Sequence, residues 1–262
     1  MKYLKIFVEK CKIDIMSTAI YRANFIFWFI QGTVNALLGY ICIEFIYGSV
    51  ESIAGWNKHE MLILIATTHL VGDVRNIICG NQNSFVYGIA SGGFDRMIIK
   101  PLNLMFQINV NFVNPITLLM GWVLPVSVIC VQATHLGTHI GILQILLYVI
   151  FIFNGAIVAG SFRLILYSLA FVFVKVDGID NVTYTINDMA GKPKEIFANK
   201  YMRMFFTFLL PVIPIVNAPA GVLLQKCTGV EMLCYLGVGV MFSVLAFVAL
   251  RLGMRRYNSA SS

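Results

Sequence analysis

Charged residues are scarce in this sequence, at 12% of 262 residues, whereas a soluble domain carries about 25%. Hydrophobic residues make up 59% of the chain, and its mean hydropathy is +0.82. This balance excludes a soluble globular domain. Because a bilayer tolerates only helices and closed barrels, the long apolar runs predict an all-α integral membrane protein, with a single transmembrane domain over residues 1–262.

The sequence also lacks the motifs of an enzyme. It has no GxxxxGK[ST] phosphate-binding loop, no HExxH and no paired cysteines at metal spacing. The apolar runs hold isolated His, Asp and Cys residues, which argues against a membrane-embedded enzyme. We therefore expect no catalytic residue, no bound cofactor, no metal site and no ATP hydrolysis in this chain. Cys227 and Cys234 are expected to be unpaired thiols, because no disulfide framework is visible.

Acidic residues are few: 12 Asp and Glu stand against 19 Lys and Arg, which gives a net charge of +7. In a soluble protein this excess would suggest a nucleic acid partner. Here the basic residues lie beside apolar runs, as they do in cytoplasmic loops of membrane proteins. We expect the lipid bilayer as a partner and no nucleic acid.

The apolar runs predict about six transmembrane helices, since a hydrocarbon core of ~30 Å needs roughly 20 residues per helix. Residues 1–22 carry apolar side chains at helical spacing and predict a helix lying in the membrane interface. Arg163 interrupts the fourth run near the end of a crossing, so one long span that projects into the cytosol is expected. The predicted spans are 25–47, 61–79, 116–133, 142–174, 204–224 and 232–250.

The fifth span contains Pro211, Pro214 and Pro219, so a regular helix is not expected to continue through its second half. We predict a Pro-broken, partly re-entrant outer end that forms part of an outer gate.

Charge asymmetry gives the predicted orientation. With the N-terminus inside, the segment between the fourth and fifth spans is cytosolic and holds Lys175, Lys192, Lys194, Lys200 and Arg203. The outer loops keep only Lys58 and Lys226. This partition follows the positive-inside rule and predicts that both termini are cytosolic.

Between the second and third spans lies the sequence GIASGGFDRMIIKPLN, residues 88–103, which we call the coupling block. Gly92 and Gly93 form a flexible hinge, and Pro101 ends a short helix. Phe94, Met97 and Ile98 recur at i, i+3 and i+4 and predict a compact apolar knob. Such a helix could receive a push from a cytosolic protein; the alternative is an ordinary interfacial connection.

Two further patterns remain open. Gly155, Ala156 and Gly160, and likewise Gly237 and Gly239, permit close helix approach, within the chain or across a dimer.

The ionisable residues Glu44, Asp73 and Arg75 lie near the ends of apolar runs. Terminal charges can reach the interface, so a structural or topological role is expected for all three.

The order and spacing of these features resemble those of type-2 ABC exporter membrane subunits, the ABC-2 transporter family, especially its bacterial six-span permeases. The resemblance rests on the N-terminal helix ending at Tyr21-Arg22, on GGFDRMIIKPLN, and on FTFLLPVIPIVNAPAGVLL before the last span. One departure is visible: many relatives carry a Tyr-Pro pair before the fifth span, where this chain has Gly191-Lys192-Pro193.

This resemblance implies half of an ATP-powered exporter or flippase in the bacterial plasma membrane. The partners would be a second copy or a similar permease, and two copies of an ABC ATPase that uses ATP and Mg. An amphipathic, lipid-like or toxic cargo would suit a cavity lined by Phe, Met and Leu. The alternative, an ion-driven secondary transporter, would show paired repeats and inward-facing ionisable residues. The residues expected to contact the ATPase are Gly92, Gly93, Phe94, Asp95, Arg96, Lys100 and Pro101.

Overall fold

The computed structural model describes residues 2–80, 82–109, 115–137, 140–171, 173 and 178–257. Every regular element in this part of the chain is a helix, as predicted. The α-helices are α1 Lys2–Ile20, α2 Arg22–Tyr47, α3 Lys58–Cys79, α4 Gln82–Ala90, α5 Asp95–Ile98, α6 Leu104–Asn109, α7 Pro115–His135, α8 Ile142–Ser168, α9 Ile179–Ala190, α10 Lys200–Phe208, α11 Val212–Leu223 and α12 Gly229–Met254. Two short 3-10 helices, η1 Leu169–Phe171 and η2 Lys194–Ile196, follow α8 and α9.

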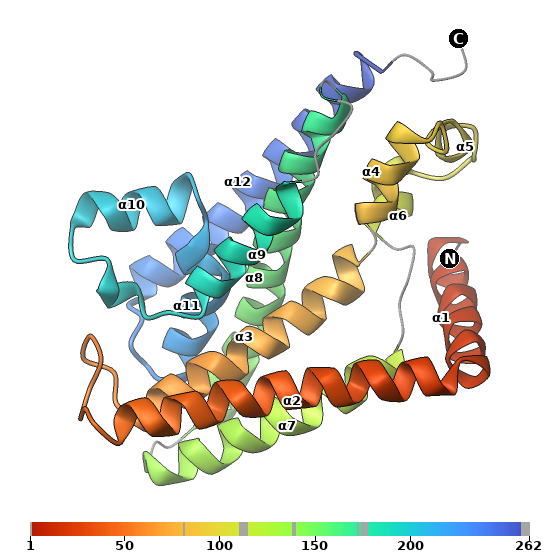
Figure 1. Ribbon diagram of the computed structural model, residues 1–262. Coiled ribbons are helices and arrows are strands. Elements are labelled where there is room, and N and C mark those ends of the chain that lie inside the picture. Colours follow the sequence, from red (N-terminus) through yellow and green to blue (C-terminus); the bar gives the residue numbers. More distant parts are fainter. Residues whose placement is uncertain are drawn as a thin grey trace.

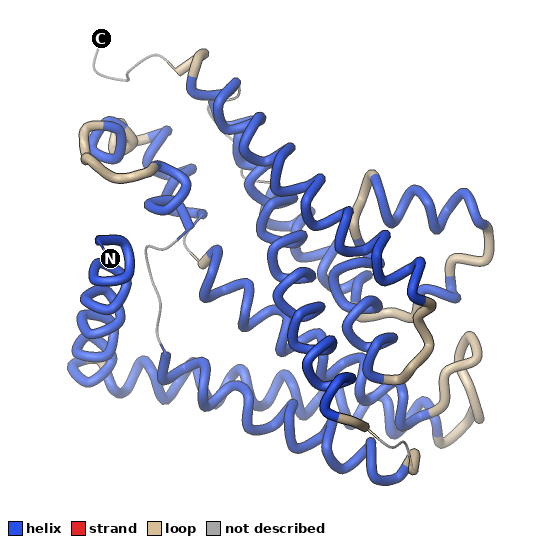
Figure 2. The backbone as a smooth tube through the Cα atoms, turned by 180° about the vertical axis from the view of Figure 1, so that it is seen from behind, coloured by secondary structure: helices blue, strands red, loops and turns tan. Residues whose placement is uncertain are grey.

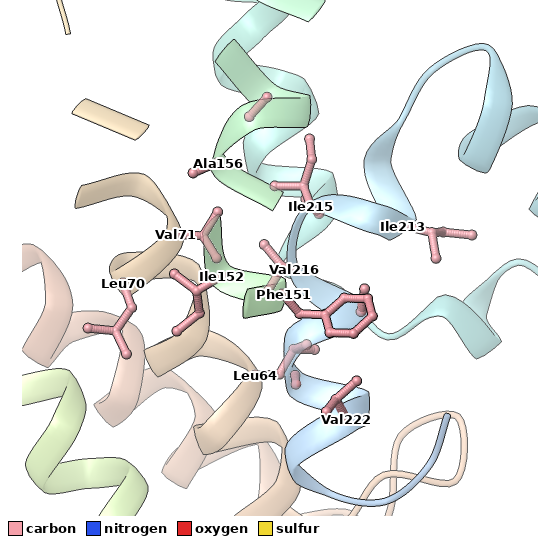
Figure 3. Packing of buried hydrophobic residues seen from close by; sticks show 14 of the residues in the cluster. Leu64, Leu70, Val71, Phe151, Ile152, Ala156, Ile213, Ile215, Val216 and Val222 are labelled. Carbon is pink, nitrogen blue, oxygen red and sulfur yellow. The ribbon is translucent and has the colours of Figure 1, made fainter. Parts of the chain in front are cut away.

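The long helix α8 is the centre of the bundle: α3, α11 and α12 pack directly against it (Figure 1). The core joins Leu64 of α3, Phe151 of α8 and Val216 of α11, which are all buried (Figure 3). Helix α7 packs on α3, and α2 contacts α3 and α7. Only Ala36 and Tyr40 of α2 are buried. Ile43 and Tyr47 also pack against the core, but most of its other apolar side chains are exposed, as expected of a helix in contact with lipid.

The bundle has two distinct ends. At one end, which we call the block end, Lys2 Nζ donates to Pro101 O over 3.2 Å, and the rings of Phe94 and Tyr257 lie 5.0 Å apart. The far end holds residues 48–60 and 224–231, where Lys226 pairs with Glu60 at 2.7 Å. The two ends of the described chain, Lys2 and Tyr257, therefore lie at the same end as the coupling block (Figure 1).

Four helical stretches are long and apolar enough to cross a membrane within the described residues: 22–47, 58–89, 142–171 and 229–254. They contain the first, second and sixth predicted spans and most of the fourth, of which residues 172 and 174 lie outside the described residues. Helix α7 supplies a shorter apolar stretch in the third. The predicted N-terminal helix is present as α1 and meets α2 at a sharp corner (Figures 1 and 2).

The segment predicted to be one cytosolic connection between the fourth and fifth spans instead runs the length of the bundle. Arg163 of α8 pairs with Asp180 at 3.2 Å near the block end. Fifteen residues later in the chain, the Trp56 indole N–H donates to Glu195 over 2.7 Å, and Lys194 pairs with Glu231 at 2.7 Å, both at the far end. Helix α9 therefore makes a passage alongside α8 (Figure 1).

The prediction that Arg163 and Lys194 lie on the same, cytosolic side of the membrane was wrong, and the reason is the composition of α9. Helix α9, with the sequence IDNVTYTINDMA, is amphipathic and too polar to register as an apolar run. It buries Thr183, Ile186 and Ala190 against the bundle. Lys175 lies outside the described residues.

The predicted fifth span is broken, as expected, but in a different position. Helices α10 and α11 meet at an angle of 101° at residues 209–211, in the first half of the predicted span. Lys194, six residues before α10, and Lys226, three residues after α11, both form ion pairs at the far end. We therefore interpret the bent pair of α10 and α11 as a re-entrant loop that enters and leaves from the far end.

The second half, expected to be irregular, is one helix. Pro211 is the N-cap residue of α11, and Pro214 lies in the first turn of this helix. Backbone N–H groups in the first turn have no carbonyl acceptor within the helix, so a proline there removes no helical hydrogen bond. Pro219 lies inside α11 and leaves the carbonyl of Ile215 without its helical donor.

The small residues pack within the chain. A Cβ on Gly155 would lie 3.0 Å from the carbonyl carbon of Ile215, and closer still to its oxygen. Gly160 faces Cys79, and Gly239 faces Asn154. The intramolecular interpretation is confirmed for these three glycines, whereas a Cβ added to Gly237 would have no described atom within 4 Å.

Candidate functional site

The coupling block folds as a tight turn followed by the single-turn helix α5. Gly92 adopts φ +71°, a left-handed conformation that disfavours other residues. The Phe94 N–H donates to Gly88 O over 2.9 Å and closes the turn. Met97 and Ile98 then donate back to Phe94 O, so Phe94 begins the helix. The turn thus fixes the direction in which α5 points.

Phe94 is buried in an aromatic cluster rather than exposed as a knob. Its ring lies 5.4 Å from that of Phe85 in α4, 5.3 Å from Phe171 in η1 and 5.0 Å from Tyr257 after α12. Its side chain is 0% exposed. The prediction that Phe94 belongs to an apolar face presented to a partner was wrong, because periodicity shows which residues share a face but not which way each side chain points. Phe94 anchors the block to three other elements.

The outward face of the block is formed by later residues. Ile98 and Ile99 are 51% and 80% exposed. Beside them is a surface hollow of about 410 Å³. It is lined by Ser84, Tyr87, Gly88, Ser91, Gly93, Arg96, Met97 and Lys100. Of the residues predicted for coupling, Arg96, Lys100 and Pro101 are exposed, Gly92, Gly93 and Asp95 are half-buried, and Phe94 is buried.

Helix α1 supports the block from the N-terminal side. Besides the bond from Lys2 to Pro101, the Tyr3 hydroxyl accepts from Asn103 N over 3.3 Å, and the Tyr3 ring lies 4.9 Å from Phe106. Burial lowers the pKa of Lys10, and the positive charge of Lys100 lowers it further. The block end therefore gathers positive charge from two separate segments.

At the far end, an ion-pair network surrounds the end of α11. Lys226 lies 4.3 Å from the centre of the Trp56 ring, in addition to pairing with Glu60. Burial raises the pKa of the Cys227 thiol to about 11. Cys227 and Cys234 are free thiols, as predicted.

The predicted gate residues Pro211, Pro214 and Pro219 are all buried. The side-chain amide of Asn217 in α11 donates to Ala190 O over 3.1 Å and to Lys192 O over 2.9 Å. Its oxygen accepts from Lys194 N over 2.8 Å. These bonds tie α11 to the chain that follows α9.

A cavity of about 290 Å³ lies between α2, α3 and α7. Helix α3 contributes His69 and Asp73, which are four residues apart and share a face. The Asp73 carboxylate lies against α7, where a Cβ on Gly121 would be 3.0 Å from Oδ2. The other lining residues are Trp28, Phe29, Gly32, Thr33, Ala36, Met120, Leu124 and Pro125.

Sequence reasoning assigned Asp73 only a structural or topological role. The signal that could have identified the site is the His69 and Asp73 pair on one face of an otherwise apolar helix. Among the described residues, no three or more His, Cys, Asp and Glu side chains form a group that could hold a metal ion.

The helices, their apolar surfaces and their lengths define an all-helical, multi-pass membrane protein. A protein-family model described as "ABC-2 family transporter protein" matches residues 33–261. The chain therefore belongs to the ABC-2 family, whose members are membrane transport subunits that normally work with an ATPase subunit. The resemblance predicted from the sequence is confirmed. No curated protein and no solved structure was found to match the chain.

Proposed function

We propose that this permease subunit exports or flips an amphipathic, lipid-like or toxic compound across a bacterial plasma membrane, with both termini in the cytoplasm. A second copy or a similar permease completes the pathway. Two copies of a separate ABC ATPase, which bind ATP and Mg, supply the energy. Family membership supports this assignment over an ion-driven secondary transporter.

The observation that carries the proposal is the construction of the coupling block. A helix of one turn has no stability of its own. Phe94 holds it by contacts with α4, η1 and the end of α12, while Ile98 and Ile99 face outward. A force applied to this surface acts on three elements at once. That is the requirement for a lever driven by an external ATPase.

The same surface defines the chemistry of the partner. The hollow beside α5 accepts a side chain between Tyr87, Arg96 and Lys100. Because Lys10 adds charge nearby, an ATPase surface with an apolar centre and acidic rim complements it. Gly92, Gly93, Asp95 and Pro101 shape the block rather than supply most of the contact.

The transport step is alternating access. ATP binding closes the two ATPase subunits, the block pushes the helices, and the pathway changes from cytoplasm-facing to outward-facing. Helix α11, with Pro211, Pro214 and Pro219, forms part of the outer gate, because it ends beside the far-end ion pairs and is bound to the α9 connection through Asn217.

The test compares two exposed apolar residues at opposite ends of the bundle. Ile99→Asp adds a charge to the centre of the docking surface, where the side chain is 80% exposed. Val230→Asp is the matched control, since Val230 is 79% exposed and lies in the first turn of α12, where an acidic residue is favoured. Each variant is co-expressed with candidate ABC ATPases from the same organism, starting with any that is encoded by a neighbouring coding sequence.

We expect Ile99→Asp to reduce ATPase co-purification and ATP-dependent transport by at least tenfold, while Val230→Asp retains both. Equal retention by the two variants would refute docking at the block. Transport that persists with a hydrolysis-deficient ATPase would instead favour the secondary transporter.

A further inference from the structure

The cavity between α2, α3 and α7 holds one carboxylate in surroundings that are otherwise aromatic, apolar or neutral. Helical rise puts Trp28, six residues from the start of α2, and Asp73, six residues from the end of α3, each about 9 Å from the end of its helix and within the bundle. A carboxylate at this depth is costly unless a positive charge or a proton accompanies it.

The described residues form no ion pair or hydrogen bond with Asp73, and Arg75 acts on it only by longer-range attraction. No described Lys, Arg or His nitrogen lies within 4.0 Å of it, and no described donor bonds to it. Arg75, the nearest cation in the sequence, donates to Asn76 instead. His69 lines the same cavity without forming an ion pair with Asp73. The charge of Asp73 is therefore available to a molecule in the cavity.

The lining indicates an organic cation and not a metal ion. A hard metal ion takes several oxygen ligands, whereas this cavity offers one carboxylate and the hydroxyl of Thr33. Trp28 and Phe29 offer aromatic faces, which attract ammonium groups. Met120 and Leu124 would contact an apolar body.

The cavity is also open to an amphiphile that arrives through the bilayer. Its outer wall is α2, in which only Ala36 and Tyr40 are buried. Trp28 is 59% exposed and Met120 is 44% exposed, so the edge of the cavity lies at the outer surface of the bundle. A headgroup can occupy the cavity while its apolar tail stays in lipid.

We propose that this cavity binds a protonated or quaternary amine that carries an apolar group, with Asp73 as its counter-charge and Trp28 against its cationic face. The identification of this cation as the transported compound rests on the proposed function. The binding site itself does not, because binding requires neither ATP nor the ATPase.

The test uses the full chain in lipid nanodiscs without ATPase, with empty nanodiscs as background. The probe is radiolabelled benzyltrimethylammonium, and its uncharged isostere, neopentylbenzene, serves as the competitor. Asp73→Asn keeps the shape of the side chain against Gly121 and removes its charge. Asp188→Asn is the control, since Asp188 of α9 has an exposed carboxylate that pairs with Lys192. Trp28→Leu is a second variant at a side chain too exposed to be required for folding.

We expect saturable probe binding that weakens at least tenfold in Asp73→Asn and several-fold in Trp28→Leu, with Asp188→Asn unchanged and no displacement by neopentylbenzene. Absence of saturable binding, equal binding by Asp73→Asn, or displacement by the neutral isostere would overturn the site. If binding behaves as expected but no ATPase associates with the chain, the site stands and the transport proposal fails. If probe binding behaves as expected but ATP-driven transport of amphiphiles is unaffected by Asp73→Asn, the site stands and the identification of the cation as the transported compound is overturned.

Discussion

The contact between Gly155 and Ile215 makes a quantitative prediction about the centre of the bundle. Pro219 leaves the Ile215 carbonyl without its helical donor, and that carbonyl points at Gly155 of α8. In Gly155→Ala, the new Cβ would lie 3.0 Å from the carbonyl carbon and 3.3 Å from Cα, whereas carbon atoms prefer about 3.5–4.0 Å. Both atoms belong to backbone inside a buried helix, so no side chain can rotate away. Helices α8 and α11 must separate.

Overpacking of this kind costs about 1–3 kcal/mol. Because only backbone can move, the upper part of this range applies, about 2–3 kcal/mol, and alanine in place of glycine recovers about 1 kcal/mol of helix stability, which leaves a net loss of about 1–2 kcal/mol. At roughly 2–4 °C per kcal/mol for a chain of this size, the melting temperature should fall by about 2–8 °C. Gly237→Ala is the matched control: Gly237 is also inside a long helix, but nothing described lies within 4 Å of its added Cβ.

The assay is thermal unfolding of the detergent-purified chain, followed by the loss of the monodisperse size-exclusion peak. Gly237→Ala should match or slightly exceed the wild type. A Gly155→Ala melting temperature equal to that of Gly237→Ala would refute the packing argument. A change of oligomeric state without a change of melting temperature would show instead that Gly155 lies on a dimer face.

Two further predictions concern the coupling block and the course of the chain. Phe94→Ala should destabilise the chain by about 3 kcal/mol or more, because it removes the ring at the centre of the aromatic cluster. Ile98→Ala should change the stability by less than about 0.5 kcal/mol, because the Ile98 side chain is exposed. Equal melting temperatures for the two variants would contradict the anchoring role of Phe94. In a cysteine-free background, Lys194→Cys and Ile99→Cys should react with a membrane-impermeant maleimide from opposite sides of the membrane. The reason is that the chain passes from the block end to the far end through α9. Labelling of both cysteines from the same side would contradict this course of the chain.

Much of the fold could be predicted from apolar run length alone. The runs 25–47 and 232–250 lie inside α2 and α12, because helices surrounded by lipid or by other helices are apolar throughout. The run that begins at Ile142 continues past Arg163 as one helix, as predicted. These features depend on local composition, which the sequence shows directly.

Features that depend on tertiary contacts could not be predicted in the same way. Helix α9 is polar along one face, and only its contacts with α8 and α11 reveal that it packs against the bundle and carries the chain toward the far end. Phe94 and Ile98 both belong to the apolar pattern of the block, yet one is buried and the other is exposed. Asp73 gains its significance from Trp28 and Gly121, which are distant in sequence.

The contacts also suggest how a push at the coupling block divides the bundle. Phe171 links the block to the end of α8, and Gly155 fits α8 closely to α11. Asn217 joins α11 to the connection after α9, while Asp180 joins the start of α9 back to α8. Helices α8, α9 and α11 are thus linked at several points along their lengths and should move together. Helix α2 lies outside this group, because among the described elements its extensive contacts are with α1, α3 and α7. The Asp73 cavity lies beneath α2, so displacement of α2 relative to α3 would change the space around the carboxylate. A site at such a boundary can differ in affinity between two conformations, which is the property that a transported compound requires of its binding site.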